Sequence, residues 1–159
     1  MAFDLDKLQR TTQNGIKQKE ITKKIKKNKT KEELNNIILN FNKLLYTEEF
    51  EDRLQLILEA YANKGFTTHK FHFELENIHS SGLTGYSLRL YVDNNSIVES
   101  FTHIKTNVND IEYLVDSSIN CIKTKLEVLR LFVDVTDDNI LEEHHTDNSF
   151  YRVRGTISF

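Results

Sequence analysis

The sequence predicts an α+β protein, with N-terminal helices followed by an antiparallel or mixed sheet of about five strands and one helix, residues 109–126, packed on it. Three patterns support this fold class. Apolar residues recur at helical spacing up to about residue 61, alternate with polar residues between 71 and 104, and return to helical spacing over 109–126. Helices that precede and follow strands joined by short turns are typical of the α+β class.

The N-terminal part predicts two helices. Residues 4–27 form a polar segment with a thin apolar stripe, which suits an arm or a partner-docking helix better than a core helix. Thr30 and Glu33 have the spacing of a capping box, and this predicts the start of a second helix. We therefore expect a helical, lysine-rich arm over residues 1–46 and an α+β domain over 47–159. The stripe of the first segment consists of Leu5, Leu8, Thr12, Ile16, Ile21 and Ile25.

The middle of the chain predicts one more helix and a three-stranded meander. Thr47 is the expected cap of a helix that stops at Asn63-Lys64-Gly65, where glycine tolerates a left-handed backbone. The period then changes to two, which predicts strands around 71–75, 86–92 and 97–104 with one buried face. Asp93-Asn94-Asn95-Ser96 predicts the turn between the last two of these strands.

The C-terminal part predicts a helix and two strands. Asn109, with Glu112 in the reciprocal position, is the expected cap of the 109–126 helix. Residues 128–135 are apolar at both alternating sets of positions, which favours a central strand. After a polar segment over 136–148, residues 150–159 predict a final strand in which Arg152 and Arg154 lie opposite the apolar face.

Composition excludes several classes of protein. Cys121 is the only cysteine, so neither an intrachain disulfide nor a cysteine-based zinc site can form. We expect this thiol to be buried and structural. No apolar run approaches the ~20 residues of a membrane helix, and the N-terminus has no signal-peptide pattern. With 38% hydrophobic residues and a net charge of −3, the chain is expected to be a cytoplasmic protein with an ordinary core and no cofactor.

A run of lysines is the first candidate contact surface. Basic helices bind phosphate backbones, so a nucleic-acid-binding accessory protein is one alternative function. However, no aromatic residues for base stacking are interleaved, and the run contains no arginine, the residue that binds phosphates and bases in a bidentate way. A solvated helix face is the competing interpretation. The run over 17–31 contains Lys17, Lys19, Lys23, Lys24, Lys26, Lys27, Lys29 and Lys31.

The acidic segment 134–147 is the second candidate. Its carboxylates and imidazoles could bind a divalent metal or carry protons, which makes a metal-dependent enzyme the second alternative. The spacing fits neither an EF-hand nor a metalloprotease helix, because the calcium-loop glycine is missing and the two histidines are adjacent. A solvated loop is the simpler interpretation, so no catalytic or metal residue is assigned. The segment contains Asp134, Asp137, Asp138, Glu142, Glu143, His144, His145 and Asp147.

The remaining histidines do not predict a site. His69 and His72 are three residues apart on an expected strand, so their side chains should lie on opposite faces. His79 and His103 are not followed by the paired motifs of a phosphoesterase. We therefore expect no metal site and no enzymatic activity from these residues.

The order of elements over residues 48–159 resembles that of neck and tail-terminator proteins of tailed phages. The pattern is a leading helix that ends at Gly65, a meander, one helix at 109–126 and two strands, the last running from Tyr151 to Phe159. The resemblance implies a ring-forming homo-oligomer that contacts other virion proteins, is assembled in the host cytoplasm and carries no cofactor. These proteins have no diagnostic motif, so no functional residue is carried over to this sequence.

Overall fold

The fold comes from a computed structural model, which describes residues 3–80, 83–103, 111–137, 143–145 and 148–159. The chain forms two compact units, Met1–Asn35 and Asn36–Phe159. The sequence suggested a division after residue 46, at the end of the N-terminal helical segment. The observed division comes earlier because Ile37, Phe41 and Leu45 are buried in the core of the second unit.

The N-terminal segment is one continuous helix, α1 (Leu5–Leu45), and the predicted break before Thr30 is wrong. The backbone is helical through Thr30, so this residue is not an N-cap. The physical reason is that a capping box is needed only where the amides of a first turn lack carbonyl partners. At Thr30 the preceding helical turn supplies these carbonyls. Residues 24–31 contain no proline or glycine that would end the helix before Thr30, and lysine has a good helix propensity.

Helix α2 (Glu48–Ala62) has the predicted ends. At its start, the amide of Phe50 donates a 3.3 Å hydrogen bond to the hydroxyl oxygen of Thr47. At its end, Gly65 has a φ of +86°, and the amides of Gly65 and Phe66 donate to the carbonyls of Ala62 and Tyr61. This pair of hydrogen bonds is a Schellman motif, in which a glycine supplies the left-handed residue.

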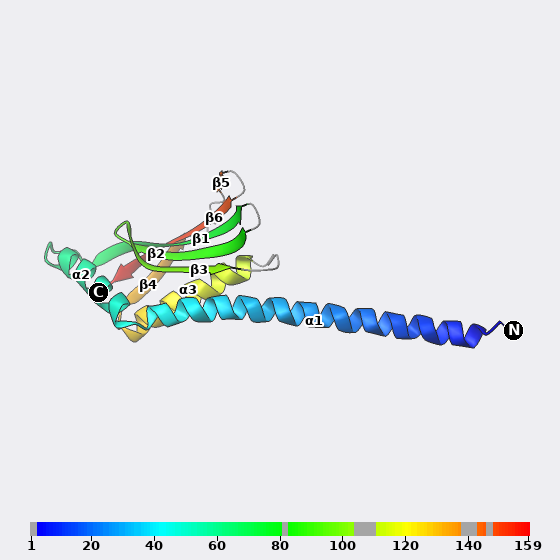
Figure 1. The fold of residues 1–159 in the computed structure, drawn as a ribbon. Helices are drawn as coiled ribbons and strands as arrows, with labels where there is room; N and C mark the ends of the chain where they lie inside the picture. The colour runs from blue at the N-terminus through cyan, green and yellow to red at the C-terminus, as the bar shows by residue number, and fades with distance from the viewer. Residues whose placement is uncertain (1–2, 81–82, 104–110, 138–142, 146–147) are drawn as a thin grey trace. The chain divides into compact units, whose positions relative to one another are not determined.

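The α+β class is confirmed by a six-stranded antiparallel sheet (Figure 1). The strand order is β3-β2-β1-β6-β4, and the short β5 pairs with β6. Strands β1 to β3 form the predicted meander. The strands are β1 (Thr68–Ser80), β2 (Leu83–Val92), β3 (Asn95–His103), β4 (Phe132–Asp137), β5 (Glu143–His145) and β6 (Asn148–Ser158).

The turn between β2 and β3 forms as predicted and is two residues long. Val92 pairs with Asn95, while Asp93 and Asn94 have φ angles of 54° and 60°. Two consecutive positive φ values define a type I′ turn, whose twist matches that of the flanking strands. Aspartate and asparagine tolerate this conformation better than other non-glycine residues.

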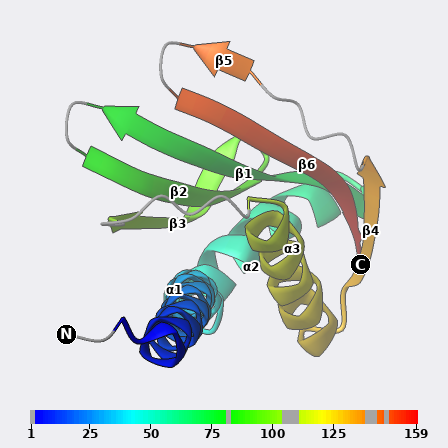
Figure 2. The ribbon, with the colours of Figure 1, turned by 90° about the vertical axis from the view of Figure 1, so that its right-hand side faces the viewer.

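One face of the sheet forms the core. Phe73 is fully buried between its partners Leu90 on β2 and Val153 on β6, and along β1 every second residue from Phe71 to Leu75 is buried. Figure 2 shows α2 and α3 (Ile111–Val128) on the same side of the sheet. None of the helices described for the unit Asn36–Phe159 covers the opposite face (Figure 2), which we call the open face, and polar residues such as Glu74 and Arg152 lie there between the core positions.

Strand β4 is an edge strand, and the predicted central strand over residues 128–135 is wrong. Residues up to Val128 belong to α3, and the chain then turns at Arg130, which has a φ of 63°. The strand begins only at Phe132, whose residue surface is 78% exposed. A continuous apolar run therefore covered two elements, a helix end and an edge strand, which periodicity alone does not separate.

Two further predictions concern residues outside the described part of the chain or at its borders. The expected cap at Asn109 lies outside the described residues. The final strand is observed, with Val153 and Ile157 buried and with Arg152 and Arg154 at the alternating positions. None of the helices in the described ranges combines the length and the apolar character needed to span a bilayer.

Candidate functional site

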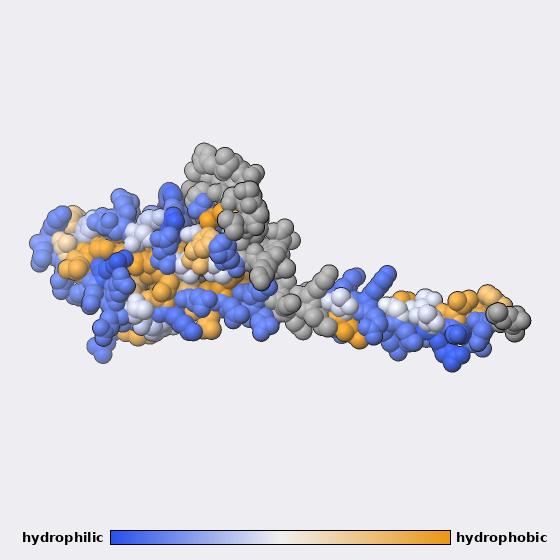
Figure 3. Space-filling model, viewed as in Figure 1, coloured by the Kyte–Doolittle hydropathy of each residue, from blue (hydrophilic) through white to orange (hydrophobic). Residues whose placement is uncertain are grey.

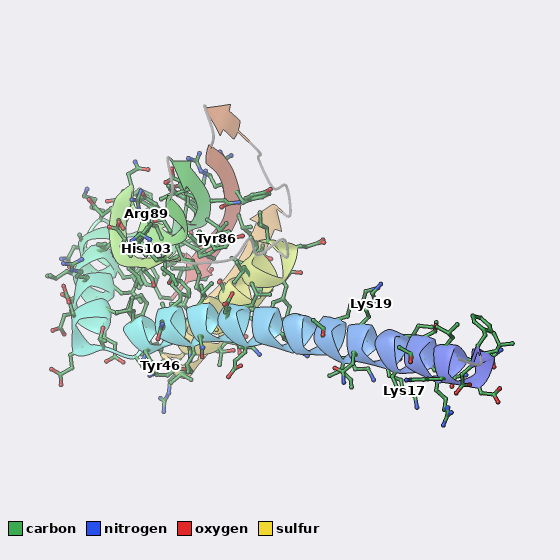
Figure 4. All side chains as sticks on the ribbon, turned by 45° about the vertical axis from the view of Figure 1, so that its right-hand side comes forward. Lys17, Lys19, Tyr46, Tyr86, Arg89 and His103 are labelled. Atoms are coloured by element: carbon green, nitrogen blue, oxygen red, sulfur yellow. The ribbon has the colours of Figure 1, made fainter. Side chains whose placement is uncertain are left out.

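The lysines of the N-terminal run do not share one face of α1. Lys17, Lys24 and Lys31 follow one line along the helix, because seven residues make nearly two turns. Lys19 and Lys23 are exposed on another side, and Figure 4 shows Lys17 and Lys19 leaving the helix in different directions. Lys26, Lys27 and Lys29 are helical, but their side chains lie outside the described set. Positive charges that are spread around a helix suit a solvated helix better than a surface that binds a phosphate backbone.

The apolar stripe of the same helix is shorter than predicted. Leu5, Leu8 and Ile16 are 52–56% exposed and fall within about 80° of one another at about 100° per residue. Ile21 is equally exposed but lies on the other side of the helix, about 160° from Leu5. Figure 3 shows apolar residues separated by hydrophilic ones along this part of α1. The row that can contact a partner is therefore Leu5, Leu8, Thr12 and Ile16, which we call the apolar row.

The open face of the sheet carries cross-strand ion pairs. Arg152 on β6 donates two hydrogen bonds, of 2.9 Å and 2.6 Å, to one carboxylate oxygen of Glu74 on β1. Arg89 on β2 pairs in the same way with Glu99 on β3, at 3.2 Å and 3.0 Å. Each pair joins residues that are directly opposite in the register, so the strand pairing positions them.

His72 lies beside these pairs on the open face, in the next row of the register with Arg154 and Tyr91. Its ring stacks on Tyr91 with 4.6 Å between centroids, and its Nε2 is 3.4 Å from Oε1 of Glu74. Burial lowers the pKa of His72, and the nearby charges of Arg152 and Arg154 lower it further, while Glu74 opposes this effect. The histidine is therefore held mostly neutral near neutral pH.

A hollow of about 800 Å³ lies where β1 begins and β2 ends. It is formed by the end of α2, the connection into β1, the β2–β3 turn and the C-terminal half of β6. Its volume is in the range of small-molecule sites. Polar and aromatic side chains predominate in its lining, which consists of Tyr61, Phe66, Thr68, His69, Lys70, Phe71, His72, Asp93, Asn94, Arg152, Arg154, Gly155 and Thr156.

Tyr61 connects the aromatic residues of the hollow. Its hydroxyl donates a 2.6 Å hydrogen bond to Asp93, and this bond raises the pKa of Tyr61. The centroid of its ring lies 4.0 Å from the ring centroid of His69 and 6.0 Å from that of Phe66. We call Tyr61, Phe66 and His69 the aromatic cluster.

His69 contributes a buried polar atom, Nε2, that has no hydrogen-bond partner among the described residues. Its side chain is 10% exposed, and its Nε2 is 3.9 Å from Oδ1 of Asp93, which is too long for a hydrogen bond. Burial lowers the pKa of His69, although Asp93 opposes the shift. A neutral imidazole nitrogen in this position can still donate or accept one hydrogen bond.

The other predicted sites are not assembled in the described residues. Within the acidic segment 134–147, residues 138–142 and 146–147 lie outside the described part of the chain, as do the side chains of the other residues from 136 onward. Among the described residues, no three His, Cys, Asp or Glu side chains gather in a way that could hold a metal ion. Cys121 is a half-buried free thiol, and burial raises its pKa, which disfavours the reactive thiolate.

Sequence reasoning did not predict the hollow. Tyr61 and Asp93 are 32 residues apart, and Arg154 is opposite His72 only because β1 pairs with β6. The one available signal was the placement of Arg152 and Arg154 opposite the apolar positions of the last strand. His69 and His72 lie on opposite faces of β1 as predicted, yet both line the hollow.

No protein-family model matches the chain, and no curated protein matches its sequence.

Proposed function

We propose that this chain is a structural assembly protein that acts through protein–protein contacts, with its place at the head–tail junction or in the tail of a tailed-phage particle. The observation that carries the proposal is the apolar row of α1. Leu5, Leu8 and Ile16 remain about half exposed, in a helical segment whose own residues offer no second surface to bury them. Helices of this kind are stabilised mainly by packing against a partner.

The partner that we propose is another copy of the chain. When the apolar rows of two copies pack against each other, each helix buries its own row, and this burial stabilises both segments. The element order over residues 48–159, shared in pattern with ring-forming neck and tail-terminator proteins, supports the phage context. A ring requires, in addition to this like-with-like helix contact, a head-to-tail contact whose rotation closes.

Two doubly substituted proteins test the apolar row by light scattering coupled to size exclusion. Leu8→Glu with Ile16→Glu introduces two charges on the row, and we expect the assembled protein to become a monomer. Asn14→Glu with Gln18→Glu introduces the same charges about 180° and 220° away from Leu5 and should leave assembly unchanged. A wild-type protein that is monomeric at all concentrations would contradict the proposal.

The lysine run separates assembly from nucleic-acid binding. Charge reversal at Lys23 and Lys24 should leave the assembly mass unchanged, because these side chains are exposed and surface pairs contribute under about 1 kcal/mol each. If the run served a phosphate backbone instead, the wild type would shift DNA or RNA at low salt and lose this binding steeply as salt rises. Portal, capsid or tail genes beside the coding sequence would independently support the phage context.

A further inference from the structure

We propose that the hollow at the start of β1 is a binding site for a free nucleotide, with the base at the aromatic cluster and the phosphate at a basic cluster formed by Lys70, Arg152 and Arg154. This assignment concerns a different surface from the apolar row of α1. It rests on the two kinds of chemistry that line one hollow of about 800 Å³.

The basic cluster is built by strand pairing. Lys70 is opposite Thr156, and His72 is opposite Arg154, so Lys70 and Arg154 are diagonal neighbours on the same face. Diagonal neighbours have Cα atoms about 7–8 Å apart, within the reach of two long side chains toward one phosphate. Among the described side chains, neither Lys70 nor Arg154 has a carboxylate within salt-bridge distance.

Two carboxylates that border the hollow are engaged, whereas Asp134 and Asp137 of β4 lie opposite Thr156 and Arg154 in the strand register. Glu74 accepts both hydrogen bonds from Arg152, and Asp93 accepts the hydroxyl of Tyr61. Arg152 uses its Nε and Nη2 atoms for Glu74, which leaves its Nη1 without a partner among the described residues. A guanidinium has five N–H donors, so a carboxylate-bound arginine can still donate to an oxyanion.

The aromatic cluster suits a planar base. Phe66 is 54% exposed and presents a free ring surface beside Tyr61. Stacking on aromatic rings tolerates any base because every base has a π-face. The Nε2 of His69 is a buried hydrogen-bonding atom of the same cluster, and no described residue provides its partner.

Both clusters are needed to select a nucleotide. The cations alone would bind inorganic phosphate, and the rings alone would bind an uncharged aromatic compound. A ligand that joins a phosphate to a flat ring uses both sets of contacts, so we expect it to bind more tightly than either part.

Calorimetry on the full chain tests the site with AMP, GMP, inorganic phosphate and adenosine as probes. We expect AMP or GMP to bind with a Kd of about 1 mM or tighter, and phosphate and adenosine each to bind at least about tenfold more weakly. Arg154→Gln and Phe66→Ala should each weaken nucleotide binding about tenfold or more. Both side chains are exposed, so the substitutions spare the core.

Matched controls replace the same residue types elsewhere. Arg53→Gln removes an exposed cation of α2, and Phe132→Ala removes an exposed ring of β4, and neither should alter binding. The proposal is overturned if neither AMP nor GMP binds at concentrations several times the expected Kd. It is also overturned if phosphate binds as tightly as AMP and Phe66→Ala does not weaken AMP binding. Binding of a single-stranded oligonucleotide without binding of any mononucleotide would also overturn it.

Discussion

The ammonium of Lys125 lies 2.6 Å from Oε1 of Glu51 and 4.3 Å from the centroid of the Tyr46 ring. Lys125 belongs to α3, Glu51 to the first turn of α2, and Tyr46 to the connection between α1 and α2. The side chain of Lys125 is only 4% exposed, whereas that of Glu51 is 46% exposed. One buried lysine therefore ties together three parts of the helical layer in a partly desolvated position.

This contact predicts a measurable coupling energy. Removing Glu51 leaves the ammonium in a buried position without its acceptor, so Glu51→Gln should destabilise the protein by about 1–2 kcal/mol. A double-mutant cycle with Lys125→Met in urea unfolding should give a coupling of about 1 kcal/mol or more. The exposed Glu49–Arg53 pair of α2 is the control, with an expected coupling of under about 0.5 kcal/mol. Equal couplings in the two cycles would contradict the structural role of the buried contact.

Gly155 predicts a steric cost. A Cβ at this position would come within 2.5 Å of the Phe71 ring and 2.8 Å of the Asp134 carbonyl oxygen. Gly155→Ala should therefore lower the free energy of unfolding by about 1–3 kcal/mol. Adding Phe71→Leu should recover part of this loss, because the smaller side chain makes room. Gly15→Ala, where nothing lies within 4 Å, should instead increase helicity in circular dichroism. A Gly155→Ala variant with the same free energy of unfolding as the wild type would contradict the close packing of β6 against β1.

Arg130 predicts a stabilising substitution. Its φ of 63° lets its amide and that of Leu131 donate to the carbonyls of Glu127 and Leu126, which ends α3 in a Schellman motif. A left-handed conformation costs a non-glycine residue roughly 1–2 kcal/mol, and glycine avoids most of this cost. The greater conformational entropy of glycine in the unfolded chain offsets part of this gain. Arg130→Gly should therefore raise the free energy of unfolding by up to about 1 kcal/mol. Arg130→Ala keeps the strain, so a glycine variant no more stable than the alanine variant would count against this backbone assignment.

His69 and His72 predict a loss of stability in mild acid. Burial lowers the pKa of both side chains below the ordinary value of 6.5, so between the folded pKa and 6.5 the unfolded chain binds more protons. Their contribution is thus fully present above pH 6.5 and is lost as the pH falls through the folded pKa. Urea unfolding between pH 8 and pH 5 should show this decline.

The decline should become shallower in a His69→Gln, His72→Gln double variant. His103→Gln replaces an exposed histidine of β3 and serves as the matched control, which should keep the wild-type slope. If the double variant shows the full decline, other groups are responsible for it.

Local patterns predicted most of the elements correctly. The cap at Thr47, the glycine stop at Gly65 and the turn at Asp93-Asn94 each depend on residues within a few positions, and all three form as expected. The alternation in β1, β2 and β6 identified the buried face because the side-chain period of a strand is two. The break proposed at Thr30 failed since a capping pattern inside a sequence with no helix breaker does not stop propagation.

By itself, the sequence determined the α+β class, the buried and polar faces of the strands, and the exposed apolar positions of α1, because these follow from backbone periodicity and local capping. Only the tertiary structure decided that β4 is an edge strand, that β1 lies between β2 and β6, and that Lys70, Arg154 and Tyr61 line one hollow. Pairing between β1 and β6 joins residues about 80 positions apart, and its partner choice depends on competition among all strands for the same core. Patterns within a single segment carry no information about that competition.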